Sequence, residues 1–312
     1  MKRKTEVSEL IFRIVAYFFL IVFAAMCIYP LVFALSSMFS SWDAVRNNEV
    51  ILWPTGKLQL DSFKFVFNSA NFWVSYSNTL FVTFIGTVWC LIYSILGAYA
   101  LSKKRLMGRH GFNFFLVFTM WFSAGVVPQF LNYKATGSVM ATLFAGSTNM
   151  ADIDLKWLIV LAMGMNATNI ILLRNSFEGV PSEIEEAARI DGATELQILT
   201  KVYIPMSKAT IATVALFFGI SRWNGYFWAY RVTSAAGQNY SWPVQVYMRD
   251  FIQKETGLTG SYDIDTSDLA NVGQGTSIAY AMVIFAMVPI LVIYPFIQKY
   301  FAKGVNMGGV KE

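Results

Sequence analysis

The sequence predicts an all-α membrane protein, and three observations support this prediction. Hydrophobic residues make up 56% of the 312 residues, and the mean hydropathy is +0.49, which is more apolar than soluble globular proteins are. The apolar residues gather into runs of roughly 20, the length of helix that crosses about 30 Å of hydrocarbon. Basic residues concentrate between alternate runs, as they do on the cytoplasmic side of membrane proteins. Because no linker divides the chain, we expect one transmembrane domain over residues 1–312.

Six apolar runs are long enough to cross a membrane. They cover residues 10–36, 72–101, 112–131, 155–173, 210–228 and 277–301. The first run follows basic residues, as a secretory signal would, but it is longer than a signal core and has no clear small-x-small cleavage site. We therefore expect it to remain as a span. Longer polar connections, residues 37–71, 132–156 and 231–276, would lie together on the opposite side from the basic segments.

An even number of spans places both termini on one side, and the basic residues identify that side. They lie before or at the start of the first run, in the second and fourth connections, and at or after the end of the sixth run, so the positive-inside rule assigns these segments to the cytoplasm. The residues are Lys2, Arg3, Lys4, Arg13, Lys103, Lys104, Arg105, Arg109, Arg174, Arg189, Lys201, Lys208, Lys299, Lys303 and Lys311. The net charge of +5 thus reflects orientation in the membrane, and we expect no nucleic-acid partner.

Residues suited to catalysis or metal binding are scarce. Cys27 and Cys90 lie inside predicted spans without metal-ligand spacing, and the single histidine, His110, lies in a basic loop. None of the six runs contains an acidic residue, and no G-x-x-x-x-G-K-[ST] loop occurs that would cradle ATP phosphates. We therefore expect no catalytic, cofactor-binding or metal-binding residues. A secondary carrier, a channel and a polytopic enzyme acting on a lipid-linked sugar remain as alternative classes.

The segment 181–205, between the fourth and fifth runs, predicts two short helices joined by a turn. Each helix begins with an S/T-x-x-E/Q capping box, at residues 182–185 and 194–197. Gly192 follows an aspartate and favours a left-handed turn between the helices. Pro205 is expected to end the second helix, because proline lacks the backbone donor that the helix needs.

Each of the two helices has an apolar stripe. Ile184, Ala187 and Ala188 form it on the first helix, and we expect one stripe to pack on the chain's own spans while the charged edge faces a partner. The second stripe consists of Leu196, Leu199, Val202 and Tyr203. An ordinary amphipathic connection is one alternative. A DNA-binding helix-turn-helix is another, but residues 178–208 carry six acids against three bases, and this charge repels phosphate.

The stretch Glu186-Ala187-Ala188, Gly192 and residues 202–205 resembles the EAA motif of bacterial ATP-binding cassette (ABC) import permeases: EAA, three residues, G, nine residues, I-x-L-P. The likeness extends over nearly the whole chain and points to the carbohydrate-type permeases, similar to the smaller permease of maltose systems. Further stretches that resemble this family are residues 78–80, 97–100, 222–224 and 294–305. Residues 120–128 resemble the branch that imports complex oligosaccharides.

This resemblance implies the six-helix architecture of type I ABC importer permeases in the bacterial plasma membrane, with both termini in the cytoplasm. It implies a second permease subunit, two cytoplasmic ATPase subunits that bind ATP and Mg²⁺, and an extracytoplasmic sugar-binding protein. This chain would then be a transporter permease and not an enzyme. The segment 181–205 would be the coupling hairpin that docks on the ATPase. The residues to which the resemblance assigns this coupling are Glu186, Ala187, Ala188, Gly192 and Pro205.

Polar residues near the end of the fifth run are candidates for the substrate pathway. Arg222 and Asn224 are costly inside a membrane unless they face a cavity or a partner, and Trp223 and Tyr226 can stack on sugar rings. Asn166 and Asn169 in the fourth run are weaker candidates. Hydrogen bonding between helices, or anchoring of the aromatic residues at the membrane interface, would explain the same residues.

Overall fold

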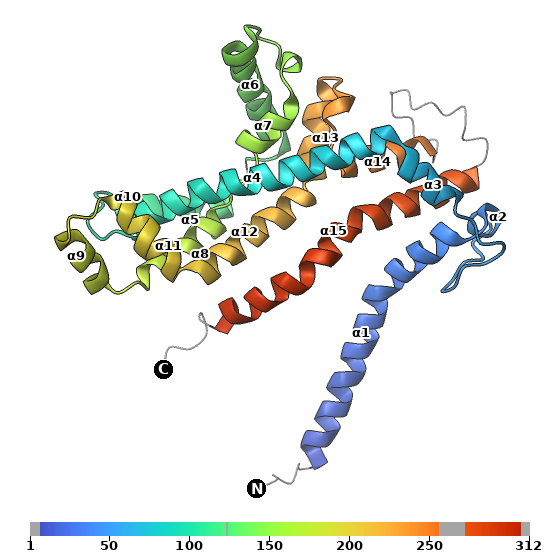
Figure 1. Ribbon diagram of the computed structural model, residues 1–312, viewed down its shortest axis with the longest axis horizontal. Coiled ribbons are helices and arrows are strands. Elements are labelled where there is room, and N and C mark those ends of the chain that lie inside the picture. Colours follow the sequence, from blue (N-terminus) through green and yellow to red (C-terminus); the bar gives the residue numbers. More distant parts are fainter. Residues whose placement is uncertain (1–6, 123, 256–271, 307–312) are drawn as a thin grey trace. The chain divides into compact units, whose positions relative to one another are not determined.

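The structure is a computed structural model that describes residues 7–122, 124–255 and 272–306, and all regular secondary structure in these ranges is helical (Figure 1). The α-helices are α1 (Val7–Phe39), α2 (Trp42–Arg46), α3 (Asp61–Asn68), α4 (Ala70–Ser102), α5 (Arg109–Trp121), α6 (Val126–Ala145), α7 (Leu155–Ala162), α8 (Ala167–Glu178), α9 (Ser182–Ile190), α10 (Glu195–Ile198), α11 (Ile204–Met206), α12 (Lys208–Trp223), α13 (Tyr226–Ala235), α14 (Val244–Glu255) and α15 (Val272–Asn306). Short 3₁₀-helices η1 (Met150–Asp152) and η3 (Asn239–Ser241) and a π-helical turn η2 (Leu199–Tyr203) complete the elements. Lys2, Arg3, Lys4, Lys311 and residues 256–271 of the third long connection lie outside the described ranges.

The chain forms two compact units, Met1–Ala70 with Met248–Val288 and Asn71–Tyr247 with Pro289–Glu312. In the first unit, most large apolar side chains of α1 are exposed, as suits a helix surrounded by lipid or by other subunits. A small core of this unit contains Ala44, Val45 and Val50.

Three helical segments are each long and apolar enough to cross a membrane: Glu9–Phe39, Ala70–Ser102 and Gly275–Pro295. Three helix pairs meet the same criterion only as bent pairs, and with them the number of candidate spans reaches six. The bend is 46° between Leu155–Ala162 and Ala167–Glu178, and 86° between Glu195–Met206 and Lys208–Trp223. The third pair joins Arg109–Trp121 and Val126–Ala145.

Two helices end at other positions than the predicted apolar runs do. The third apolar run was expected to give way to a polar connection at residue 132, but α6 continues to Ala145 and ends at Gly146, whose φ of +66° suits a left-handed helix end. Residues 132–145 retain many helix formers, which explains the continuation. The fifth run was expected to reach residue 228, but α12 ends at Trp223 and a new helix begins at Tyr226.

The second unit has one core to which the predicted hairpin contributes. Helices α4, α8 and α12 supply its buried side chains together with the segment after Gly192. They are Cys90, Ala98, Leu173, Phe177, Ile198, Leu199, Tyr203, Val214 and Phe218. In Figure 1 the hairpin lies at the C-terminal end of α4. The hairpin is therefore packed against the membrane helices of its own chain.

Candidate functional site

The structure contains a helix pair at the predicted place. Helix α9 ends at Ile190, and the backbone turns through Gly192, whose φ is +78°. The amide of Gly192 donates to the carbonyl of Arg189 at 3.1 Å, and the amide of Ala193 donates to that of Ala188 at 3.0 Å. An added Cβ at Gly192 would meet no atom within 4 Å, so the turn requires glycine for its backbone conformation and not for space.

One of the two predicted capping boxes is present. The amide of Thr194 donates to the side chain of Gln197 at 2.8 Å, and the amide of Gln197 donates to the Thr194 hydroxyl at 3.4 Å. The other prediction is wrong, because Pro181 precedes α9 as its cap and Ser182 is the first helical residue, without a capping bond. The side chain of Glu185, which the box needs, makes other contacts instead.

The predicted apolar stripes are wrong in part. On α9, Ile184 and Ala187 are exposed, while Ala188 is half-buried against the core. On the second helix Leu196 is 66% exposed, and Ile198 is buried in its place. The π-helical turn explains this change, because it sets Ile198 five residues before the buried Tyr203 and so alters the register expected for an α-helix.

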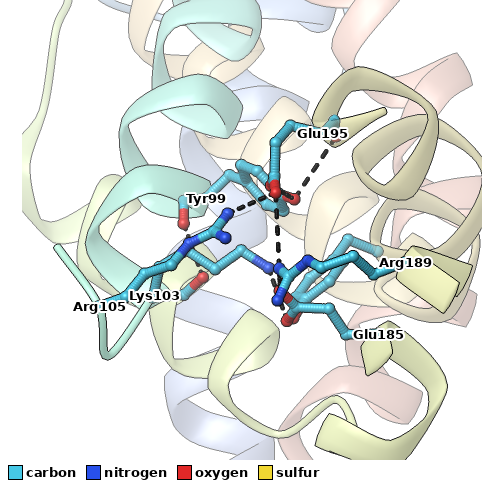
Figure 2. Close-up of polar contacts among 8 residues, drawn as sticks. Tyr99, Lys103, Arg105, Glu185, Arg189 and Glu195 are labelled. Atoms are coloured by element: carbon cyan, nitrogen blue, oxygen red, sulfur yellow. Dashed lines mark hydrogen bonds and ion pairs between the residues drawn. The ribbon is translucent and has the colours of Figure 1, made fainter. Parts of the chain in front are cut away.

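Glu185 joins the hairpin to the end of α4 (Figure 2). Its carboxylate forms an ion pair with the Nζ of Lys103 at 2.7 Å and accepts a hydrogen bond from the Tyr203 hydroxyl at 2.5 Å. The side chains of Lys103 and Glu185 are only 9% and 15% exposed. The Lys103 ammonium also lies 4.1 Å from the ring centre of Tyr99 and 4.0 Å from that of Tyr203, where a cation is attracted by the aromatic faces. We call Lys103, Glu185, Tyr99 and Tyr203 the lysine clamp.

A second carboxylate extends these contacts to the other hairpin helix. The hydroxyl of Tyr99 donates to Glu195 at 2.8 Å, and Arg105 forms an ion pair with the same carboxylate. Arg189 connects the two acids, at 2.6 Å from Glu185 and 3.5 Å from Glu195 (Figure 2). Both helices of the hairpin are thus attached to the end of α4 and to the loop that follows it.

The environment of the lysine clamp shifts the pKa values of both of its charged groups. Burial raises the pKa of Glu185, but the hydrogen bonds from Lys103 and Tyr203 outweigh burial, and the pKa lies below its usual value. Burial lowers the pKa of Lys103, and the contact with Glu185 opposes this effect.

The residues to which the resemblance assigns coupling lie on the outside of this attachment. Glu186, Ala187, Gly192 and Pro205 are exposed, whereas Ala188 is half-buried. No ion pair or side-chain hydrogen bond holds Glu186 within the described part of the chain. Apolar side chains that lie exposed near Glu186 in the sequence are Ile184, Ile190 and Leu196. A groove of about 520 Å³ also reaches Glu186 and Arg189, between α9 and the loop after α4.

The four candidates for the substrate pathway separate into two pairs. Arg222 and Trp223 are buried at the end of α12, and the Trp223 ring lies edge-on to Tyr76 at 6.1 Å. Asn224 and Tyr226 are exposed after the helix end. A cavity of about 110 Å³ lies beside Arg222 and is lined in part by Gly164, Gly225 and Trp228.

The weaker candidates in the fourth run also occupy different environments. Asn166 is exposed and caps α8 by accepting from the amide of Thr168 at 2.8 Å, whereas Asn169 is buried.

The lysine clamp was missed by the sequence reasoning. Lys103 was counted only as evidence for orientation, and Glu185 was assigned to a capping box. One signal indicated this contact. Glu185 lies three residues before Ala188, on the half-buried side of α9. A carboxylate at such a position needs a cation beside it, because an unpaired buried charge is costly. The sequence alone did not indicate which of the three adjacent basic residues supplies it.

Comparison with known proteins identifies the family of the chain. A family model described as binding-protein-dependent transport system inner membrane component matches residues 7–307. The polygalacturonan/rhamnogalacturonan transport system permease protein YtcP of Bacillus subtilis (strain 168) is 35% identical over 306 residues, which cover 96% of this chain and 98% of that protein. Protein LplC of the same organism is 31% identical over 287 residues, which cover 92% and 90% of the two chains.

A solved structure agrees with these relatives. A chain of a bacterial ABC transporter involved in the import of the acidic polysaccharide alginate superposes with a TM-score of 0.80 at 39% identity, over 95% of this chain and 98% of the other. The chain belongs to the family of binding-protein-dependent transport system inner membrane components. The predicted membership in the ABC import permeases, and the all-helical fold that it implied, are confirmed.

Proposed function

We propose that the chain is one of two permease subunits of an ABC importer that carries an acidic oligosaccharide across the bacterial plasma membrane. The family is that of inner membrane components of binding-protein-dependent systems, which supports an extracytoplasmic binding protein as a partner. A second permease and two cytoplasmic ATPase subunits would complete the complex. ATP and Mg²⁺ would be bound by the ATPases, since the sequence has no phosphate-binding loop of its own.

The coupling role is proposed because two adjacent glutamates make different contacts. Glu185 forms an ion pair with Lys103 of the same chain, whereas Glu186 is exposed and unpaired among the described residues. The neighbouring exposed apolar residues, among them Ile190 and Leu196, add area that a partner could bury. In our proposal the ATPase binds this outer face, and the lysine clamp passes its movement to α4.

Membrane topology follows from the same assignment. In this proposal the bent pairs α5–α6 and α7–α8 each count as one span, and the span at α12 begins after the cytoplasmic hairpin, which gives six spans and places both termini in the cytoplasm. The hairpin and the basic loop around Lys103 are then cytoplasmic, on the side where ATP is available. The third long connection, residues 231–276, faces outward, where the binding protein would deliver its cargo.

The cargo is proposed from two similar proteins. YtcP is named for polygalacturonan and rhamnogalacturonan, and the transporter of known structure imports an acidic polysaccharide. Asn224 and Tyr226, which are exposed, are the proposed contacts with sugar, whereas Arg222 and Trp223 would form the wall behind them.

The decisive experiment reconstitutes the permease with its partner subunits in vesicles and measures ATPase stimulation and uptake across a panel of acidic and neutral oligosaccharides. We expect stimulation by the binding protein loaded with an acidic oligosaccharide. Glu186→Lys should abolish stimulation while the complex still inserts in the membrane. Glu183→Lys is a matched control, because Glu183 is also an exposed acid on α9. ATP-independent uptake would support a secondary carrier or channel instead, and full coupling in Glu186→Lys would overturn the role of Glu186.

A further inference from the structure

The fourth candidate span is interrupted, and the interruption exposes backbone carbonyl groups. Helix α7 ends at Ala162, α8 begins at Ala167, and Gly164 between them has a φ of +89°. A helix leaves its last four carbonyls without intrahelical donors. In α7 these belong to residues 159–162, and inside a membrane no water is available to satisfy them. Hydrogen-bond donors for these carbonyls must therefore come from side chains or from molecules in the neighbouring cavity.

Side chains from two other helices supply these donors. The guanidinium of Arg222, on α12, donates through Nη1 to the carbonyl of Ile159 and through Nη2 to those of Val160, at 2.9 Å, and Met163. Trp89, on α4, donates through Nε1 to the carbonyl of Leu161 at 3.3 Å. One arginine thus caps two of the four α7 carbonyls and the carbonyl of Met163 in the break, which its planar fork of donors is suited to do.

Two glycines leave the space that this arginine occupies. A Cβ added to Gly164 would lie 2.6 Å from Nε of Arg222, and one added to Gly86 would lie 3.0 Å from the same atom. Arg222 is 7% exposed, and its Nε has no hydrogen-bond partner. Because both glycines crowd Nε, cargo cannot approach the guanidinium from these sides.

The charge of Arg222 is balanced by backbone dipoles. It forms no ion pair with a carboxylate in the described ranges. The carbonyl end of α7 carries the negative end of that helix's dipole, which favours a cation there. Removal of the guanidinium would therefore leave several carbonyls unsatisfied and the helix end without its counter-charge.

We propose that Arg222 is a positioning residue of the translocation pathway: it caps α7 and keeps the break between α7 and α8 open, so that the cavity wall at Gly164 keeps its shape. This inference rests on the proposed transport function, and it gives Arg222 a role through the backbone and not through contact with sugar.

The first test needs no cargo and so separates this inference from the proposed function. Met165, exposed within the break, is replaced by cysteine in a Cys27→Ala, Cys90→Ala background, because Cys27 is exposed and Cys90 contacts Arg222. The rate of labelling by a membrane-impermeant maleimide is then compared in the assembled transporter. Arg222→Met should change this rate by about tenfold, and Arg222→Lys by less, because three carbonyls lose donors in the first variant and fewer in the second. Arg231→Met, at an exposed site, should leave the rate unchanged.

The second test separates positioning from contact with cargo. Uptake of an alginate pentasaccharide and of a galacturonate trisaccharide is measured for Arg222→Lys and Gly164→Ala, at equal amounts of subunit in the membrane. A positioning role predicts that Vmax falls about tenfold in both variants while KM stays within about twofold. A rise in KM confined to Arg222→Lys would make Arg222 a cargo ligand and overturn the proposal. Unchanged labelling in Arg222→Met would also overturn it, as would failure of Arg222→Met, Arg222→Lys and Gly164→Ala all to insert in the membrane.

Discussion

Replacement of Lys103 by methionine should release the hairpin from the end of α4. The substitution keeps an unbranched side chain but removes the ammonium that lies 2.7 Å from Glu185 and near two tyrosine rings. Removal of one partner of a buried ion pair typically costs about 3–5 kcal/mol. Glu185 keeps Tyr203 and Arg189 as donors and is 15% exposed, so we expect about 2–3 kcal/mol in the docking of the hairpin.

Hydrogen exchange measures this loss directly. A loss of about 2–3 kcal/mol corresponds to exchange that is about 30–150 times faster for amides that open with the hairpin. Peptides covering residues 182–206 should show this change in Lys103→Met, while peptides covering residues 80–95 of α4 should not. Lys104→Met is the matched control, because Lys104 is adjacent and exposed. Equal exchange in Lys103→Met and the native chain, or equal acceleration in Lys104→Met, would refute the role of Lys103.

Three further perturbations test the same region. Because the folded pKa of Glu185 is depressed, the stability it contributes is present above the usual carboxyl pKa of about 4.3 and is lost as pH falls through the lower folded value. Thermal melting between pH 7 and pH 3 should therefore show a smaller acid-induced decrease in Glu185→Gln than in the native chain, and parallel curves would contradict this. Gly192→Ala should cost about 1–2 kcal/mol through its left-handed backbone alone, seen as faster exchange at the turn, and Gly192→Asn should cost less. Phe177→Ala, in the core beneath the hairpin, should cost about 3–5 kcal/mol and reduce the amount of folded subunit in the membrane, whereas an unchanged melting temperature would exclude that packing role.

The helical class and the hairpin could be predicted from the sequence because both depend on local patterns. Apolar runs of membrane length, the Thr194 capping box and the turn at Gly192 each require only neighbouring residues. The prediction of the first capping box was wrong because the spacing alone does not show what the glutamate binds. A glutamate three residues after a serine can equally well bind a residue far away in the sequence. Its partner, Lys103, is 82 residues away in the sequence, and no local signal specifies such a pair.

The breaks in the candidate spans were harder to foresee for a related reason. Gly164 is one of many glycines in apolar segments, and glycine is common in membrane helices. The break at Gly164 becomes stable only when donors from α4 and α12 reach the freed carbonyls. The sequence marked Arg222 as unusual in an apolar run, but the role that the structure suggests depends on tertiary contacts.

The length of α4 gives the lysine clamp a mechanical consequence. Its 33 residues form a rod of about 50 Å at 1.5 Å per residue, whereas the hydrocarbon layer is about 30 Å thick. An upright α4 would extend about 20 Å beyond the hydrocarbon, and the hairpin is attached at one of its ends. If the rod tilts by about 10° around its far end, the attached end moves by about 9 Å. A helix of this length thus converts a displacement of several ångströms at the hairpin into a small rotation within the membrane. This conversion requires the contacts of the lysine clamp to stay intact while the hairpin moves.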